Sequence, residues 1–463
     1  MVSVSNLVNS GLLLVSPNIY ADVATPEQAS VQKYNILNFL GGSAPYIANE
    51  GYGIDTAIPN GCKLEQVQLF SRHGERYPSK GLGKQLEAIY SKFQNYNGTF
   101  KGDLSFLNDY VYFVHDKKYY EKETTPQNSE GTFAGTTDAL RHGATFRAKY
   151  GSLYKENSTL PVFSSNSRRC YETSRYFARG FLGDNFYENK TVKFNILDED
   201  ESSGANTLTP INSCSNYNYS ASDLDPSDYN TSYLEPIVER LTKPNPGLNL
   251  TTKDVQHLFS WCAFELNVNG SSPFCNLFTN EEYIRSSYAT DLGYYYSYGP
   301  GNYLSATVGS TLLDASLRLL KDTSSENKIW LSFAHDTDLE IFLSAVGLFK
   351  PDGDLPVDYI PFPNPYVHSS IVPQGARIYT EKFSCSGESY VRYLVNDAVI
   401  PIQSCATGPG FSCKLDDFEE YVNGNIGDSN FIDDCGIEPS VPQNLTFYWD
   451  YKNTTYNAPL GDF

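Results

Sequence analysis

The chain has 463 residues, of which 40% are hydrophobic and 19% are charged, a composition typical of globular proteins and unlike that of fibrous or disordered ones. Its 34 Lys and Arg residues against 54 Asp and Glu residues give a formal net charge of −20, which argues against nucleic acid or an anionic membrane as a partner. No apolar run approaches the roughly 18 residues that a membrane-spanning helix needs, so we expect no membrane anchor.

Glycosylation acceptor triplets and cysteines are both frequent. Asn-x-Ser/Thr begins at Asn97, Asn157, Asn189, Asn218, Asn230, Asn249, Asn269, Asn444 and Asn453. The nine cysteines form no Cys-x-x-Cys pair, so we expect no structural metal site. These features favour a secreted, disulfide-bonded glycoprotein, located outside the cell or in the cell wall or periplasmic space, over a cytosolic protein with accidental triplets. Residues 1–20 are a weak candidate for a signal peptide, because they contain no basic residue.

The predicted elements repeat a pattern of strand, polar turn and helix three times, which is typical of an α/β protein with helices on both faces of its sheet. Residues 200–300 are dense in Ser, Asn, Tyr and Pro and predict an exposed insertion rather than a sheet core. In chain order we expect strands over 64–70, 160–163, 192–196 and 329–333, an antiparallel edge strand near 391–395, and helices over 136–154, 170–183, 304–319 and 339–348.

Three polar clusters stand at predicted strand ends. They are Arg72-His73 with Arg76, Arg168-Arg169, and His335-Asp336. Because ligands of α/β proteins bind at the carboxyl ends of strands, we expect the clusters to converge on one site. Guanidinium groups match phosphate oxygens, and an imidazole held among cations has a lowered pKa and keeps a lone pair for attack. The alternative is an arginine-rich loop that pairs with the acidic surface.

Ser71-Arg-His-Gly-Glu-Arg-Tyr-Pro78 resembles the signature of the histidine acid phosphatases, and among them the secreted fungal acid phosphatases and phytases. His335-Asp336 is similar to the second motif of that family. The segment from Asn166 to Phe177 resembles the middle segment of the family, which contributes a third arginine, and counting back from Phe177 places it at Arg169 rather than Arg168. The likeness spans roughly residues 30–440 and is weakest over 200–300.

The resemblance implies a phosphoglycerate mutase-like fold, a mixed sheet with helices on both faces plus a smaller, mainly α-helical inserted domain. We expect residues 1–57 to form an N-terminal extension. The α/β catalytic domain would comprise 58–90, 131–205 and 300–463, and the inserted domain 91–130 and 206–299.

The resemblance also implies the reaction, a two-step hydrolysis of phosphate monoesters at acidic pH, with phytate among the substrates. His73 would attack phosphorus and form a phosphohistidine, and Asp336 would protonate the leaving alcohol. Neither a metal nor a cofactor is required, because arginines replace the cations of metallophosphatases. The groups that would hold the equatorial phosphate oxygens are Arg72, Arg76, Arg169 and His335.

Lys80 and Lys84, just after the signature, are candidates for contacts with further phosphates of a polyphosphorylated substrate such as phytate; the alternative is two solvated lysines. The partners that we expect are small phosphate monoesters, and a homo-oligomer stays open. Asp336 could instead, or also, cap the helix predicted to begin near Leu339.

The resemblance suggests the disulfides Cys62–Cys385, Cys214–Cys435, Cys262–Cys275 and Cys405–Cys413, which leave Cys170 as a buried thiol. Two short sequences repeat parts of the motifs, Arg141-His142-Gly143 and His115-Asp116. We interpret His142 and His115 as surface residues, because short motifs occur often by chance. His257 and His368 have no chemical neighbours in the sequence and are interpreted as structural.

Other functions compete with this one. A cytosolic phosphate-transferring mutase of the same superfamily would need neither glycosylation triplets nor disulfides. A non-catalytic cell-wall glycoprotein on the same scaffold is disfavoured, because His73, Arg169 and Asp336 are all present. A glycosidase with paired carboxylates would leave the arginines without a role. Within the same chemistry, the alternative is a broad acid phosphatase that lacks phytase activity.

Overall fold

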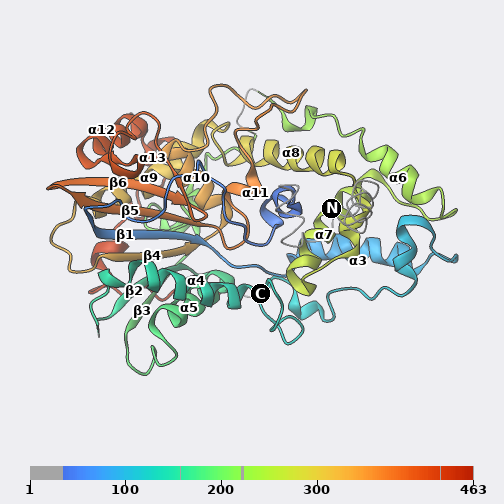
Figure 1. Ribbon diagram of the computed structural model, residues 1–463, viewed down its shortest axis with the longest axis horizontal. Coiled ribbons are helices and arrows are strands. Elements are labelled where there is room, and N and C mark those ends of the chain that lie inside the picture. Colours follow the sequence, from blue (N-terminus) through green and yellow to red (C-terminus); the bar gives the residue numbers. More distant parts are fainter. Residues whose placement is uncertain (1–34, 157, 221–223, 428, 462–463) are drawn as a thin grey trace, which may run out of the picture.

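The structure is a computed structural model that describes residues 35–461 apart from 157, 221–223 and 428. The candidate signal peptide over 1–20 and the acceptor triplet at Asn157 therefore lie outside the described residues. The described chain has two parts, one built around a sheet and one built from helices (Figure 1).

A mixed sheet of eight strands forms the centre of the larger part (Figure 1). Its order is β3-β2-β4-β1-β5-β6-β7, with β8 paired to β6. The strands β3, β2, β4 and β1 run parallel, and the strands beyond β1 pair antiparallel, so the mixed sheet predicted above is confirmed. The strands are β1 (Cys62–Arg72), β2 (Leu160–Ser165), β3 (Val192–Leu197), β4 (Ile329–Ala334), β5 (Arg377–Cys385), β6 (Glu388–Val395), β7 (Ala398–Ile400) and β8 (Cys413–Lys414).

Helices cover both faces of this sheet, and the alternation along β1 shows why. Val67 and Leu69 share a core with α4 and α5, whereas Phe70 points to the other face and meets Phe342 with 5.8 Å between ring centroids. β1 therefore buries apolar side chains on both faces, and so does β4, with Leu331 on one face and Trp330 on the other. The helices of this part are α4 (Gly135–Tyr150) and α5 (Arg168–Leu182) on one face, α9 (Tyr303–Lys321), α10 (Asp336–Val346) and α12 (Leu415–Ile426) on the other, and the short α11 (His368–Ile371), α13 (Phe431–Asp434) and α14 (Phe447–Asp450).

A smaller helical part lies at the opposite end of the molecule (Figure 1). Its core is aromatic: Trp261 is fully buried and stacks on Phe274 with 4.4 Å between ring centroids. The insertion expected over 200–300 contributes no described strand, but it has a hydrophobic core that its polar composition did not reveal. The helices are α3 (Lys80–Gln94), α6 (Leu234–Thr242), α7 (Thr252–Asn269) and α8 (Asn280–Ser297).

We retain the division into a catalytic α/β domain and an inserted helical domain as a proposal, with one change. Leu86, Ile89 and Phe93 of α3 pack in the helical core, and Ile36 and Leu37 of the N-terminal extension pack there too. A boundary at residue 90 would cut α3, so we propose that the boundary lies before this helix.

The described residues contain four disulfides, two between distant segments and two local, and they are the pairs that the resemblance implies: Cys62–Cys385, Cys214–Cys435, Cys262–Cys275 and Cys405–Cys413. The first joins β1 to β5 at the point where the two residues face each other in the sheet. Cys170 is a buried free thiol. Since the first two pairs close loops of more than 200 residues, they restrict the unfolded chain strongly.

The two short sequences that repeat parts of the motifs, at His142 and His115, lie in different surroundings. His115 is exposed, as expected. The prediction that His142 lies on the surface is wrong: this side of α4 packs against the sheet, and His142 Nε2 lies 2.8 Å from the hydroxyl of Tyr379. Burial lowers the pKa of His142 well below its ordinary value, and Arg377 adds to the effect. His142 is thus a core residue of α4.

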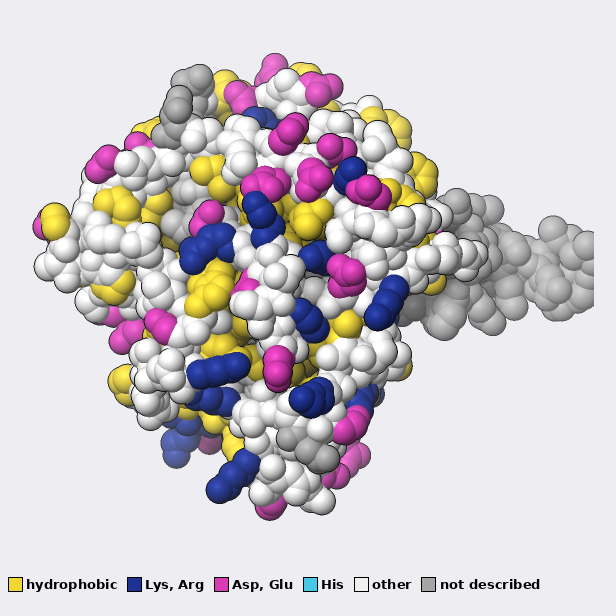
Figure 2. Space-filling model, turned by 90° about the vertical axis from the view of Figure 1, so that its left-hand side faces the viewer, with side chains coloured by type: hydrophobic (Ala, Val, Ile, Leu, Met, Phe, Trp, Pro, Cys, Tyr) yellow, Lys and Arg dark blue, Asp and Glu magenta, His cyan; other side chains and the backbone are white. Residues whose placement is uncertain are grey.

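The surface mixes both signs of charge. At the end of the molecule opposite the helical part, Lys and Arg side chains are interspersed with Asp, Glu and apolar side chains (Figure 2). Among the described residues, no helix has both the length and the apolar character needed to cross a membrane.

Candidate active site

The three polar clusters lie at one edge of the sheet, where the parallel strands end. Arg72 ends β1 and faces Ala334, the last residue of β4, and Ser164 of β2 faces Phe333 of β4. The chain leaves each strand into its cluster: His73 follows β1, Arg169 lies at the start of α5 after β2, and the His335-Asp336 pair follows β4. The sheet register therefore brings the clusters together.

His73 is held rigidly and kept uncharged. Its backbone N–H donates to the Ala334 carbonyl, and its Nδ1 lies 2.9 Å from the Gly74 carbonyl oxygen. Only a protonated Nδ1 can donate to a carbonyl, so in the neutral ring Nε2 keeps its lone pair. Burial, followed by Arg169 and Arg72, lowers the pKa of His73 well below its ordinary value. The imidazole therefore stays neutral at pH values where an ordinary histidine is charged, and its Nε2 lone pair stays available.

Arg72 connects the N-terminal extension to Asp336. Its Nη1 donates to the carbonyls of Gly42 and Val372, and its Nη2 lies 3.0 Å from Asp336 Oδ2. Burial would raise the pKa of Asp336, but Arg72 and other nearby cations outweigh it and lower this pKa to about 2.

Asp336 is not the helix cap: α10 begins at Asp336, and Asp338 accepts the backbone N–H of the capping residue His335.

Two further arginines face the same site. Arg76 Nη1 donates to the Tyr77 carbonyl, and its guanidinium lies over Phe264; burial and the neighbouring arginines lower the pKa of Arg76 to about 10. Arg169 Nη2 lies 3.2 Å from His335 Nδ1. Arg168, in contrast, directs its Nε to the Gly461 carbonyl at 3.4 Å. Arg169 is therefore the arginine of this pair that the structure places beside the site.

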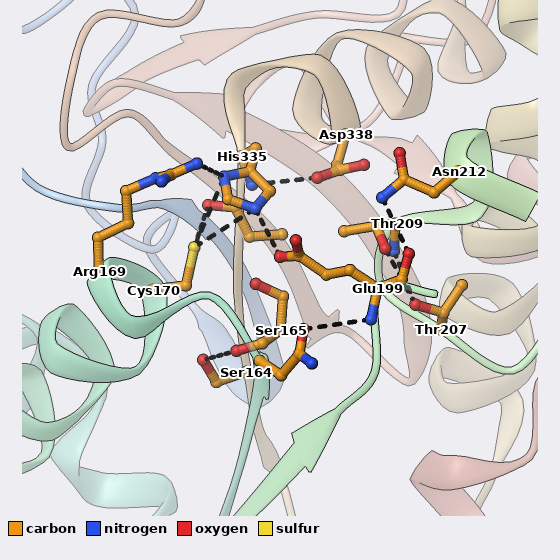
Figure 3. A network of polar contacts seen from close by, with 12 residues as sticks. Ser164, Ser165, Arg169, Cys170, Glu199, Thr207, Thr209, Asn212, His335 and Asp338 are labelled. Atoms are coloured by element: carbon orange, nitrogen blue, oxygen red, sulfur yellow. Dashed lines mark hydrogen bonds and ion pairs between the residues drawn. The ribbon is translucent and has the colours of Figure 1, made fainter. Parts of the chain in front are cut away.

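His335 is fixed by Glu199, which the sequence analysis missed. His335 Nε2 lies 2.6 Å from Glu199 Oε1, and the Cys170 sulfur lies 3.8 Å from His335 Nδ1 (Figure 3). Burial opposes the charged form, but Cys170 and Glu199 outweigh it and raise the pKa of His335 well above its ordinary value. Glu199 lies two residues beyond β3, so the strand-end rule, applied to this fourth parallel strand, could have found it.

Glu123 and Thr173 support the turn that follows His73, and neither was predicted. Glu123 Oε1 and Thr173 Oγ1 both accept the backbone N–H of Gly74, at 2.7 and 2.8 Å. Burial raises the pKa of Glu123 to about 8. A side chain at Gly74 would begin 2.9 Å from the Gly135 carbonyl oxygen, so the turn needs glycine there.

A cavity of about 440 Å³ opens beside these residues. Arg72, Arg76 and Asp336 line it, together with residues of α7 and α8. Lys80 and Lys84 are exposed in the first turns of α3 and do not line this cavity. Within the described part of the chain, no cluster of three His, Cys, Asp or Glu residues has the geometry to hold a metal ion.

Known proteins resemble this chain in sequence and structure over nearly their full length. The model of the histidine phosphatase superfamily (branch 2) matches residues 63–396. The chain is 69% identical to a phytase of Candida albicans, with 99% of this chain and 100% of that one covered, and 44% identical to a repressible acid phosphatase of Saccharomyces cerevisiae, with 98% and 97% covered. The crystal structure of the phytase from D. castellii matches with a TM-score of 0.92 at 57% identity, covering 97% and 98% of the two chains.

Sequence, fold and site lead to the same assignment. The family model covers more than half of the chain and includes both His73 and the His335-Asp336 pair. The relatives match from end to end, so the likeness is not limited to one motif. The chain therefore belongs to branch 2 of the histidine phosphatase superfamily and is a hydrolase of phosphate monoesters.

Proposed function

We propose that this protein is a secreted acid phosphatase that hydrolyses phosphate monoesters, phytate among them, through a phosphohistidine at His73. The observation that carries the proposal is the state of His73, a buried and neutral imidazole whose Nδ1 is tied to Gly74 and whose Nε2 is left for attack. The nearby arginines supply the charge that a phosphoryl group needs.

In the first step, His73 Nε2 attacks phosphorus in line with the leaving oxygen. The N–P bond forms while the bond from phosphorus to the leaving oxygen breaks, and the leaving oxygen takes a proton from Asp336. Arg72, Arg76 and Arg169 neutralise the equatorial oxygens, as does His335 when its contact with Glu199 keeps it charged. The products are the free alcohol and a phosphohistidine.

In the second step, water attacks the phosphohistidine. Its proton goes to the Asp336 carboxylate, the N–P bond breaks, and the electron pair returns to Nε2. Inorganic phosphate leaves, and Asp336, whose pKa in the ion pair with Arg72 is about 2, releases its proton to solvent. His73 returns to the neutral ring because its surroundings disfavour the charged form.

The proton that Asp336 donates has to arrive with the substrate. In the ion pair with Arg72 the pKa of Asp336 is about 2, so the carboxylate is ionised at the pH of an acid phosphatase. A phosphate monoester loses its second proton near pH 6, and below that pH the monoanion can pass this proton to Asp336 while its own charge engages Arg72. We therefore expect kcat/KM to fall above about pH 6, and an optimum at neutral pH or above would contradict the role of Asp336.

Secretion is supported by the surface. The acceptor asparagines in the described residues are all exposed, from Asn97 in the helical part to Asn453 near the C-terminus. The disulfides require an oxidising compartment. The names of the relatives, a phytase and acid phosphatases, support the substrate class. Initial rates on phytate, 4-nitrophenyl phosphate and sugar phosphates would establish its breadth.

Trapping the covalent intermediate tests the mechanism. Quenching the enzyme during turnover of 4-nitrophenyl phosphate in alkaline denaturant, followed by peptide mapping, should locate one phosphoryl group on His73. His73→Ala should abolish turnover with an unchanged melting curve, because no other described group replaces the nucleophile. His115→Ala, at an exposed histidine, is the matched control and should keep full activity. A His73→Ala variant that retains a few per cent of the activity would rule out the covalent route.

A further inference from the structure

The cavity beside the catalytic groups has charge at only one end. Of the described residues that line it, Arg72, Arg76 and Asp336 are the only charged ones, and all three belong to the catalytic set. Its volume of about 440 Å³ falls within the range of small-molecule pockets. Whatever extends from the reacting phosphate into this cavity therefore meets neutral side chains.

One wall of the cavity is a stripe of small residues on α8. Ala289, Thr290, Gly293 and Ser297 follow Ser286 by three, four, seven and eleven positions, so the five residues share one face of the helix. All five are partly exposed, in contrast to the buried tyrosines on the opposite side of α8. The small side chains leave room, and three of them carry hydroxyl groups.

The facing wall comes from α7 and combines polar and aromatic groups. Gln256 and Ser260 line the cavity one turn apart, and within the described part of the chain their side chains make no hydrogen bond. Phe259 and Phe264 line it beside them and are themselves buried. This wall offers free hydrogen-bonding groups and apolar surface.

No charged residue of α7 or α8 is among the described residues that line the cavity. Glu265 of α7 accepts hydrogen bonds from Tyr110 and Ser272 in the helical core. Asp291 of α8 accepts the backbone N–H of His368. The fold thus turns the charges of α7 and α8 away from the cavity.

We propose that these two walls form the leaving-group subsite, and that it recognises a neutral, hydroxyl-bearing alcohol through hydrogen bonds and apolar contact rather than through charge. The inference rests on the phosphatase function proposed above and assigns to this cavity the alcohol moiety of sugar and polyol monophosphates. Among the described residues that line the cavity, the cations are Arg72 and Arg76, which we place at the reacting phosphate, so the other phosphates of a polyphosphorylated substrate in this cavity add little to binding.

Gly293 allows a sharp test. A Cβ built at Gly293 has no atom within 4 Å, so a longer side chain can enter the cavity without displacing the protein. Gly293→Lys and Gly293→Met add side chains of similar length, one charged and one neutral. Gly424→Lys adds the same charge on α12, at an exposed glycine whose Cβ position is also open, and serves as the control.

The measurement is kcat/KM for myo-inositol hexakisphosphate and for myo-inositol monophosphate. In the wild type we expect the two values to differ by less than about tenfold. Gly293→Lys should raise the ratio of hexakisphosphate to monophosphate about tenfold over Gly293→Met, which is the contribution of one charge-assisted hydrogen bond. Gly424→Lys should leave the wild-type ratio unchanged. Melting curves of all variants check that they are folded.

Three results would overturn the proposal. Equal ratios for Gly293→Lys and Gly293→Met would show that this wall does not face the rest of the substrate. A wild-type preference for hexakisphosphate above about a hundredfold would show a cationic subsite elsewhere. If neither inositol phosphate is hydrolysed while 4-nitrophenyl phosphate still is, the leaving-group assignment fails and the phosphatase function stands; no turnover of any of the three would refute both.

Discussion

At the scale of single residues, the Asp336 carboxylate holds the Arg72 guanidinium in an ion pair, and the proposed mechanism adds a second task, protonation of the leaving alcohol. We expect Asp336→Asn to slow hydrolysis of an alkyl phosphate by about 10²–10⁴-fold. Asp336→Asn should slow the hydrolysis of 4-nitrophenyl phosphate far less, because nitrophenolate leaves without a proton.

Arg169→Ala removes a positive charge beside the phosphoryl group, which all substrates share, so the hydrolysis of both substrates should slow by about 10²–10³-fold. The measurement is kcat for both variants on both substrates.

Equal slowing of the two substrates by Asp336→Asn would contradict its role as leaving-group acid. Helix capping could not then explain the loss, because Asp338 provides the cap of α10. The remaining explanation would be that Asp336 orients Arg72 through their ion pair.

Glu199 is a positioning residue that acts through His335. We expect Glu199→Gln to lower the pKa of His335, because the neutral amide no longer favours the imidazolium. NMR titration of His335 should show this shift, and the inhibition constant of inorganic phosphate should rise about tenfold, since a cation that holds phosphate is lost. Glu201→Gln, at an exposed acid two residues away, is the control and should change neither value. An unchanged titration of His335 in Glu199→Gln would refute the positioning role.

At the scale of elements, two glycines let the backbones of α4 and α5 approach closely, next to ring contacts such as that of Phe146 with Phe177. A Cβ at Gly143 would lie 2.0 Å from the Phe177 carbonyl oxygen, and one at Gly180 would lie 2.0 Å from that of Leu140. This close approach fixes α5, whose first turn carries Arg169 and Cys170. Gly180→Ala should therefore lower the free energy of unfolding by about 1–3 kcal/mol, because the helices must move apart.

Urea unfolding of Gly180→Ala tests this packing, with Gly424→Ala as the matched control. Gly424 lies in α12 with open space around its Cβ position, so alanine there should stabilise the protein by up to about 1 kcal/mol. If Gly180→Ala proved as stable as Gly424→Ala, the contact between α4 and α5 would have room for a methyl group, and the predicted separation of the helices would be wrong.

At the scale of the whole molecule, several carboxyl groups are buried, and the effect of burial on their pKa outweighs that of nearby cations and hydrogen bonds. Burial raises the pKa of Asp291, Asp338 and Glu265 to about 7 and that of Glu123 to about 8. The unfolded chain titrates these groups near pH 4. The folded protein therefore binds their protons more tightly than the unfolded chain does, and this part of the stability is fully present only in acid.

We expect the free energy of unfolding to fall between pH 4.5 and 7.5, because each of these carboxyls loses up to about 1.4 kcal/mol per pH unit until its folded pKa is reached. His73 and His142 have lowered pKa values, so below about pH 6.5 they make the free energy of unfolding rise with pH. These two groups are outnumbered by the four carboxyls. Urea unfolding across this range should show less pH dependence for Glu265→Gln than for the wild type. Glu420→Gln removes the same charge from an exposed position and should keep the pH dependence of the wild type. An equal pH dependence of the free energy of unfolding in the two variants would contradict the expectation.

Much of the site could be predicted from the sequence because its motifs are local. The signature around His73 and the pair at His335 each follow a strand whose alternation is visible, so their place at the sheet edge could be expected. Glu199 and Glu123 could not be recognised in the same way. Each acts through a contact with a residue 136 or 49 positions away in the chain, and no local pattern marks such a partner.

The sequence by itself determined the family, the strand ends that carry the catalytic groups, and the triplets that would carry glycans, because these depend on residue order over a few positions. Only the tertiary structure decided that His142 is buried, that α3 and α7 contribute to one aromatic core, and that the cavity walls are neutral. The physical reason is packing. Which face of a helix meets another element, and which charges turn away from a cavity, depends on segments far apart in the chain.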